Sequence, residues 1–168
     1  MALTFNVAYD ELAKFKHEVR KELWTGKMNE QEFWAMLLER FPTVNAEYAA
    51  GKLISEIKPM PCLEEIPNWS KIANIHLLSN HRTEWISHII DPVKNYITSI
   101  TISDETGFCK PEMDIYLIVH SKLFNRDHVL FVDDQEKNLV QARNLGWNTL
   151  LADEKGEWIK AVRHQLLD

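Results

Sequence analysis

Short apolar segments alternate with amphipathic segments over the second part of the chain, and this alternation constrains the fold more than any other feature. Apolar runs at residues 75–78, 99–103, 129–132 and 148–151 have the length and aliphatic content of buried strands. Apolar residues at helical spacing separate these runs, over residues 83–90, 112–123, 135–145 and 157–167. The pattern predicts an α/β fold, in which a parallel sheet is covered by helices on both faces.

The first third of the chain is predicted to be helical. Apolar side chains recur at helical spacing at Leu12, Phe15, Val19 and Leu23. Gly26 is expected to end this helix, and Asn29 with Glu32 is typical of a capping box that opens a second one.

A third helix is expected over residues 46–57. The segment Lys58-Pro59-Met60-Pro61 then breaks regular structure. We therefore place a domain boundary there, with a helical subdomain at residues 1–58 and an α/β core at residues 59–168.

Composition limits the classes of partner. The 168 residues carry 19 Lys plus Arg and 25 Asp plus Glu, a net charge of −6 with no basic run, which argues against binding to nucleic acid or to an anionic membrane. The apolar runs are too short to span a membrane, and the N-terminus lacks a signal-peptide pattern. Cys62 and Cys109 are too few for a disulfide framework, so we expect a cytoplasmic protein.

Polar side chains follow the first predicted strand and precede a later helix. Ser79 and Asn80 end the first strand, where a serine can donate to a phosphoryl oxygen, although both residue types are also common helix N-caps. Lys110 lies just before Pro111 and a predicted helix, where it could neutralise an anion or be solvated. Taken singly, each of these features favours the cap or the solvated side chain. The adjacent Lys110 could lower the pKa of the Cys109 thiol, but nothing else in the sequence supports a catalytic cysteine.

Asp133 and Asp134 follow the third predicted strand. Two adjacent carboxylates at the end of a buried strand repel each other and are costly to desolvate. A bound Mg²⁺ would relieve the repulsion, since it prefers oxygen ligands. The alternative, which we weigh about equally, is that one aspartate caps the next helix and the other is solvated.

The order of these features resembles the haloacid dehalogenase superfamily of hydrolases, most of which are phosphatases. The resemblance covers roughly residues 59–153 and rests on three stretches that look like the second, third and fourth motifs of the family: Leu77-Leu78-Ser79-Asn80, Gly107-Phe108-Cys109-Lys110-Pro111, and Val129-Leu130-Phe131-Val132-Asp133-Asp134. The helical first third is similar to the small cap that many members insert between their first and second motifs.

The resemblance implies a fold and a set of roles. The fold would be a Rossmann-like parallel sheet with an N-terminal helical cap, and the activity Mg²⁺-dependent hydrolysis of a small phosphate ester. Ser79 and Asn80 would bind the phosphoryl group, and Lys110 would steady the phosphate and the nucleophile. Asp133 and Asp134 would hold Mg²⁺, with Ser79 and Lys110 counted as the catalytic residues.

The nucleophile of the family, an Asp-x-Asp at the end of the first strand, is not found in this sequence. Asp10 is the only acid near the start, and residue 12 is leucine. Asp10 is better interpreted as an early residue of the first helix, where a negative charge suits the helix dipole. We therefore expect a sheet without the usual first strand, weak Mg²⁺ binding and negligible turnover.

Three hypotheses follow from this pattern. The chain could be a shortened or inactive hydrolase, a binding or regulatory protein that retains the anion site, or an interaction protein whose sheet another chain completes. The missing strand could be supplied by residues 3–7 or by a partner, including self-association, or the flanking strands could pair directly.

Overall fold

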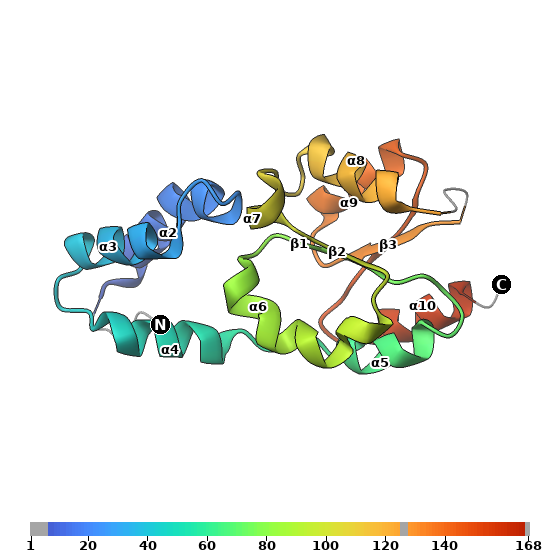
Figure 1. Ribbon diagram of the computed structural model, residues 1–168, viewed down its shortest axis with the longest axis horizontal. Coiled ribbons are helices and arrows are strands. Elements are labelled where there is room, and N and C mark those ends of the chain that lie inside the picture. The colour runs from blue at the N-terminus through green and yellow to red at the C-terminus, as the bar shows by residue number, and fades with distance from the viewer. Residues whose placement is uncertain (1–6, 125–127, 167–168) are drawn as a thin grey trace.

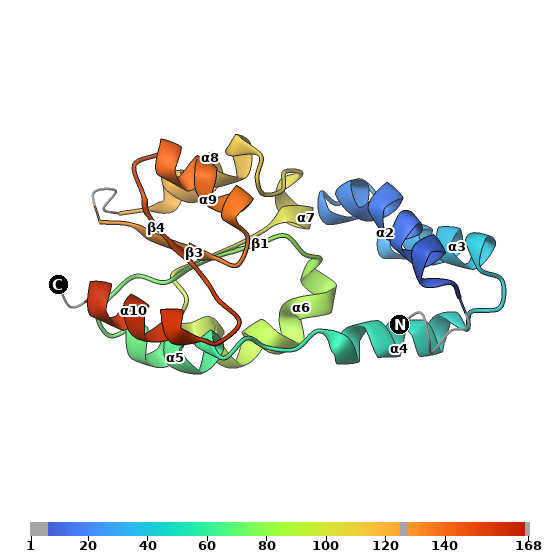
Figure 2. The same ribbon diagram turned by 180° about the vertical axis from the view of Figure 1, so that it is seen from behind.

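The computed structural model describes residues 7–124 and 128–166 and consists of a helical part beside an α/β part (Figures 1 and 2). The helical part contains α2 (Tyr9–Trp24), α3 (Glu30–Arg40) and α4 (Ala46–Glu56). Among the described residues, no helix is long and apolar enough to cross a membrane.

Local signals set the ends of the first two helices. Gly26, just past α2, has a φ of 69°, a left-handed conformation that favours glycine. The capping box of α3 is confirmed: the Glu32 amide donates to Asn29 Oδ1 (2.9 Å), and the Asn29 amide donates to Glu32 Oε2 (2.8 Å). The end of α2 and the start of α3 are therefore set by residues that are close together in the sequence.

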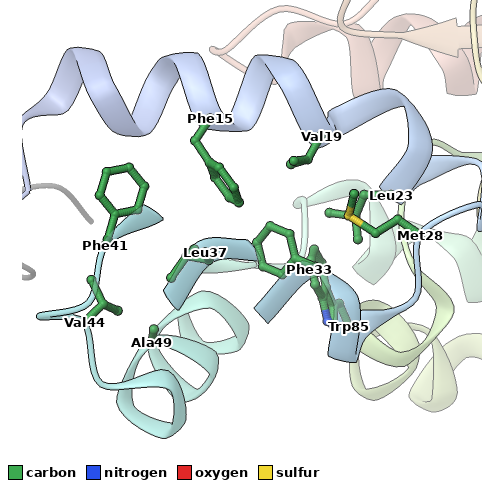
Figure 3. Close-up of a cluster of buried hydrophobic side chains, with 10 residues drawn as sticks. All are labelled: Phe15, Val19, Leu23, Met28, Phe33, Leu37, Phe41, Val44, Ala49 and Trp85. Carbon is green, nitrogen blue, oxygen red and sulfur yellow. The ribbon is translucent and has the colours of Figure 1, made fainter. Parts of the chain in front are cut away.

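The three helices enclose a hydrophobic cluster, which we call the cap cluster (Figure 3). Phe15 lies at its centre and contacts the rings of Phe33 and Phe41, each with a centroid distance of 5.9 Å. Trp85, which lies after the predicted boundary, completes the cluster and packs 5.7 Å from Phe33. The cap therefore shares its core with the α/β part, while the boundary at residue 58 stays a prediction.

The α/β part alternates strands and helices as the sequence predicts. Its elements are α5 (Cys62–Trp69), β1 (His76–Ser79), α6 (Thr83–Ile90), the 3₁₀ helix η1 (Asp91–Tyr96), β2 (Ser99–Ile102), α7 (Ser103–Thr106), α8 (Met113–Lys122), β3 (Leu130–Asp133), α9 (Glu136–Asn144), β4 (Asn148–Leu151) and α10 (Glu157–Gln165). The sequence did not predict α5, η1 or α7.

The strands form two separate parallel pairs. β1 pairs with β2, with His76 opposite Ser99, and β3 pairs with β4, with Leu130 opposite Asn148. No backbone hydrogen bond joins β1 to β3 in the described ranges. Among the described residues no strand lies between β1 and β3, and these two strands do not pair directly with each other. Of residues 3–7, only Val7 lies within the described residues, and it packs against the cap cluster.

Helices cover both faces of the strands. Figure 1 shows α8 and α9 on one side and α5, α6 and α10 on the other. Leu78 and Phe131 pack against α8 and α9, around the fully buried Tyr116. Leu77 packs against α6, and Val132 packs among residues of α5 and α10. This three-layer arrangement brings the carboxyl ends of β1 and β3 to one edge of the α/β part.

Candidate functional site

Lys110 connects the carboxyl ends of β1 and β3. Its Nζ donates to the carbonyl oxygen of Leu78 (3.1 Å) and to Asp133 Oδ2 (2.6 Å). The side chains of Lys110 and Asp133 are only 11% and 3% exposed, respectively. The pair is therefore a buried, charge-assisted contact rather than a solvated surface bridge.

Asn80 fixes the backbone on which Lys110 is carried. The Lys110 amide donates to Asn80 Oδ1 (2.7 Å), and Asn80 Nδ2 donates to the Lys110 carbonyl (2.8 Å). Both polar atoms of the Asn80 side chain are thus engaged with a loop 30 residues away. This geometry makes Asn80 a positioning residue, and direct phosphate binding by Asn80 stays a prediction.

Ser79 is the last residue of β1, next to the Leu78 carbonyl that Lys110 contacts. Its side chain is half-buried. In the part of the chain that the structure describes, its hydroxyl has no hydrogen-bond partner. The hydroxyl is therefore free to donate to a ligand at the carboxyl end of β1.

Asp133 accepts hydrogen bonds on both carboxylate oxygens. Besides the contact with Lys110, Oδ1 accepts from the Gln135 amide (2.9 Å) and from Asn138 Nδ2 (2.8 Å). Burial alone would raise the pKa of Asp133, but the charge of Lys110 and these hydrogen bonds outweigh burial, so the pKa is lowered. Asp133 is held as a carboxylate at neutral pH.

Asp134 lies in a different environment from Asp133. It is exposed, whereas Asp133 is only 6% exposed. The repulsion expected between the adjacent carboxylates is thus offset by Lys110 on one side and by solvent on the other. The exposed Asp134 agrees with the alternative in which one of the two aspartates is solvated. The sequence did not show which aspartate would be buried, because it does not show the fold of the loop that carries Lys110.

The residues present do not complete a magnesium site. Asp133 already accepts three hydrogen bonds, and no group of three or more His, Cys, Asp or Glu able to hold a metal occurs among the described residues. Mg²⁺ takes six oxygen ligands in near-octahedral geometry, many of them water. Asp133 and Asp134 remain the predicted protein ligands, but the arrangement supports no tight binding.

Cys109 does not have the environment of a reactive thiol. Burial, followed by the nearby Glu112 carboxylate, raises the pKa of Cys109. The Cys109 amide donates to Glu112 Oε2 (3.0 Å), so this segment forms a turn at the start of α8. The lowering of the pKa by Lys110 that the sequence suggested is wrong, because a carboxylate and not the ammonium faces the sulfur.

Several residues that join the cap to the α/β part could not be predicted from the sequence. Arg82, which is buried, donates from Nη1 to the carbonyls of Met28 (2.8 Å) and Leu23 (3.4 Å). Trp85 Nε1 donates to Glu30 Oε1 (2.9 Å). These contacts join residues more than 50 positions apart, and no local pattern signals them. They fix α2 and α3 beside the start of α6.

Comparison with known proteins identifies the fold. No protein-family model matches the sequence, and no curated protein matches it. A predicted HAD-like family hydrolase from Porphyromonas gingivalis superposes with a TM-score of 0.76, at 19% identity over 96% of this chain and 91% of that one. A HAD family enzyme from Bacteroides thetaiotaomicron superposes with a TM-score of 0.80, at 20% identity over 90% of this chain and 81% of that one.

A further structure of the Bacteroides enzyme bears on the site. A variant with one aspartate changed to alanine, in complex with magnesium and inorganic phosphate, superposes with a TM-score of 0.76. It is 19% identical to this chain and covers 90% of it and 89% of its own length. These likenesses confirm the expected fold.

Proposed function

Since the chain has the fold of the haloacid dehalogenase-like hydrolases, we propose that it carries the phosphate-binding part of such a site and binds phosphate groups without hydrolysing their esters. The proposal rests on the buried pair of Lys110 and Asp133, which joins the carboxyl ends of β1 and β3, where Ser79 is the last residue of β1. In parallel α/β sheets, ligands bind at this edge.

The donors at this edge suit a phosphate. The Ser79 hydroxyl can donate one hydrogen bond, and the Lys110 ammonium supplies positive charge and a further donor. Asp133 partly neutralises that charge. We therefore expect weak binding, with a Kd on the order of 1 mM, which corresponds to about 4 kcal/mol.

Neither Asp133 nor Asp10 is well placed to act as a nucleophile on a phosphoryl group. Asp133 accepts hydrogen bonds on both oxygens and pairs with a cation, which lowers its nucleophilicity. Asp10 lies exposed in the first turn of α2. That turn lies at the end of α2 away from the core (Figure 2).

A Mg²⁺-dependent phosphatase acting on a small phosphate ester is the activity that the family resemblance implies. The Mg²⁺ and phosphate held by the Bacteroides variant support that chemistry for a related fold.

Titration with inorganic phosphate, followed by NMR of the ¹⁵N-labelled chain, tests the proposal. The amides around Ser79 and Lys110 should shift with saturation, and Ser79→Ala should weaken binding by about tenfold, the value of one hydrogen bond to a charged group. Ser121→Ala is the matched control, since Ser121 is exposed near the end of α8 and its hydroxyl bonds only the carbonyl of Ile118. Equal phosphate affinity in the two variants would refute the assignment of Ser79.

A further inference from the structure

The end of α2 lies along the segment that carries Lys110. Lys21, in the last turn of α2, pairs through Nζ with Glu112 Oε1 (2.7 Å), just before α8. Gly26, just past α2, lies so close to the Asp104 carbonyl of α7 that a Cβ there would clash with it. Figures 1 and 2 both show this end of α2 beside α7. The end of α2 is thus held at two points against the segment that carries Lys110.

Arg20 and Trp24 lie on the side of α2 between these contacts and the cap cluster. At about 100° per residue, both fall between Leu23 and Lys21 around the helix. Leu23 is buried in the cap cluster, which Trp85 of α6 completes, whereas Lys21 meets the start of α8. Helices α6 and α8 cover opposite faces of the strands. The side between them therefore faces the edge where the carboxyl ends of β1 and β3 lie.

Burial and charge agree with this orientation of α2. Trp24 is half-buried, whereas Glu18 and Glu22, on the opposite side of the helix, are exposed. Burial is the main cause that raises the pKa of Cys109, and the charge of Arg20 acts in the opposite direction, so Arg20 lies near that thiol. Cys109 directly precedes the lysine of the candidate site. The side of α2 that carries Arg20 and Trp24 therefore faces the α/β part.

The guanidinium of Arg20 is oriented and available to a ligand. Its Cζ lies 5.0 Å from the centroid of the Trp24 ring, which is a cation–π contact. Both oxygens of the nearby Glu112 carboxylate are engaged, one by Lys21 and the other by the Cys109 amide. No carboxylate pairs with Arg20 within residues 7–124 and 128–166. A guanidinium presents a planar fork of donors that matches two oxygens of a carboxylate or a phosphate.

We propose that the candidate site takes phosphate esters whose alcohol part carries a second anionic group, a carboxylate or a second phosphate, which Arg20 binds from the cap. Ser79 and Lys110 bind the first phosphate, so this assignment rests on the phosphate binding proposed above and names the class of ester. Trp24 is a positioning residue, since its ring orients the guanidinium. Because Arg20 is exposed, the second group should improve affinity by about fivefold, the upper value for one exposed ion pair.

NMR titrations of the ¹⁵N-labelled chain with matched esters test this inference. The probes are the phosphate esters of glycolic, 3-hydroxypropionic and 4-hydroxybutyric acids, each compared with its uncharged amide. The three lengths allow for the span between the two anionic groups. Propane-1,3-diol bisphosphate, compared with propyl phosphate, separates a second phosphate from a carboxylate. Ethyl phosphate reports on the phosphate-binding part of the site alone.

We expect at least one doubly anionic ester to bind about fivefold more tightly than its neutral counterpart. In Arg20→Gln this ratio should fall to about one. The indole N–H resonance of Trp24 should shift with the doubly anionic ester and not with the neutral one. Arg163→Gln is the matched control, because it removes the same charge from an exposed position on α10, at the other end of the molecule, and should keep the ratio (Figure 1).

Two kinds of negative result are distinguishable. Equal affinities for charged and neutral esters that both shift the amides around Ser79 and Lys110 would overturn this inference and leave phosphate binding intact. A ratio that persists in Arg20→Gln, or that Arg163→Gln also abolishes, would overturn it as well. If ethyl phosphate and all the other esters leave those amides unshifted, the proposed phosphate binding fails, and the assignment of Arg20 fails with it.

Discussion

At the scale of single residues, the buried pair of Lys110 and Asp133 is the centre of the site. Taking two charges out of water is costly, and the pair is tolerated because each charge finds several partners: Lys110 two oxygens, and Asp133 three donors. The removal of one partner leaves the other charge buried and unpaired. A change that neutralises either Lys110 or Asp133 is therefore expected to destabilise the folded chain.

Lys110→Met, which keeps the length of the side chain but removes the ammonium, is expected to destabilise the chain by about 3 kcal/mol or more. Lys137→Met is the control, because Lys137 is exposed on α9 and should change stability by less than about 0.5 kcal/mol. The free energy of unfolding in urea measures both. A loss below about 1 kcal/mol for Lys110→Met would show that Lys110 and Asp133 are not paired in solution.

The lowered pKa of Asp133 also predicts how the stability of the folded chain depends on pH. Its pKa is lowered in the folded chain, so the unfolded chain binds a proton more readily. The stability contributed by Asp133 is therefore fully present above its unfolded pKa, about 3.9, and is lost as the pH falls through the lower folded value. Melting temperatures between pH 2.5 and 7 should show a smaller acid loss for Asp133→Asn than for the unchanged chain. Parallel curves would contradict this assignment.

The sequence predicts site residues that follow strands, and it misses those that act from a distance. Ser79 and Asp133 could be found because each ends a strand and parallel strands bring their carboxyl ends together, and Lys110 because it precedes a proline and a helix. The positioning role of Asn80 and the contacts of Arg82 could not, because they depend on how a loop and a helix far away in the chain are placed.

At the scale of secondary-structure elements, Gly26 decides how closely the cap approaches the core. Its φ of 69° is unfavourable for other residues, and an added Cβ would clash with the backbone carbonyl of Asp104 in α7. Gly51, in the middle of α4, has neither constraint, since a Cβ there would meet nothing within 4 Å. The two glycines thus form a matched pair.

Alanine at the two glycine positions should have opposite effects. Gly26→Ala should destabilise the chain by more than about 1 kcal/mol, from the left-handed backbone together with the clash. Gly51→Ala should stabilise it by up to about 1 kcal/mol, because alanine is the better helix former. Thermal unfolding followed by circular dichroism compares them. An unchanged melting temperature for Gly26→Ala would mean that the turn after α2 is not held against α7.

Local signals explain which elements the sequence predicts. The capping box at Asn29 and the glycine at position 26 define helix ends without reference to the rest of the fold. Helix α5 was missed because prolines precede it and Pro67 lies inside it. The helix forms because Ile66 and Trp69 are buried, and Trp69 packs 6.4 Å from the ring of Trp158 in α10. Tertiary packing therefore overrides the local preference.

At the scale of the whole molecule, two parallel strand pairs share a pair of helical layers, and in the part of the chain that the structure describes they are not joined into one sheet. The alternation of strands and helices predicts the class of fold and the covering of both faces. It does not predict whether β1 and β3 would hydrogen-bond directly to each other. Direct pairing would require the two strand pairs, with the helices that cover them, to approach each other. The buried contacts of Lys110 with Leu78 and Asp133 hold the ends of the two strands in place.

We propose that this chain binds phosphate groups but does not hydrolyse their esters. ³¹P NMR of 4-nitrophenyl phosphate with the chain and Mg²⁺ tests both parts in one sample. We expect the ester resonance to broaden as the chain is added, and to broaden less with Ser79→Ala. Inorganic phosphate should not accumulate above the level of a protein-free sample. Catalytic release of inorganic phosphate that Asp133→Asn abolishes would contradict it, as would an ester resonance that the chain leaves unchanged.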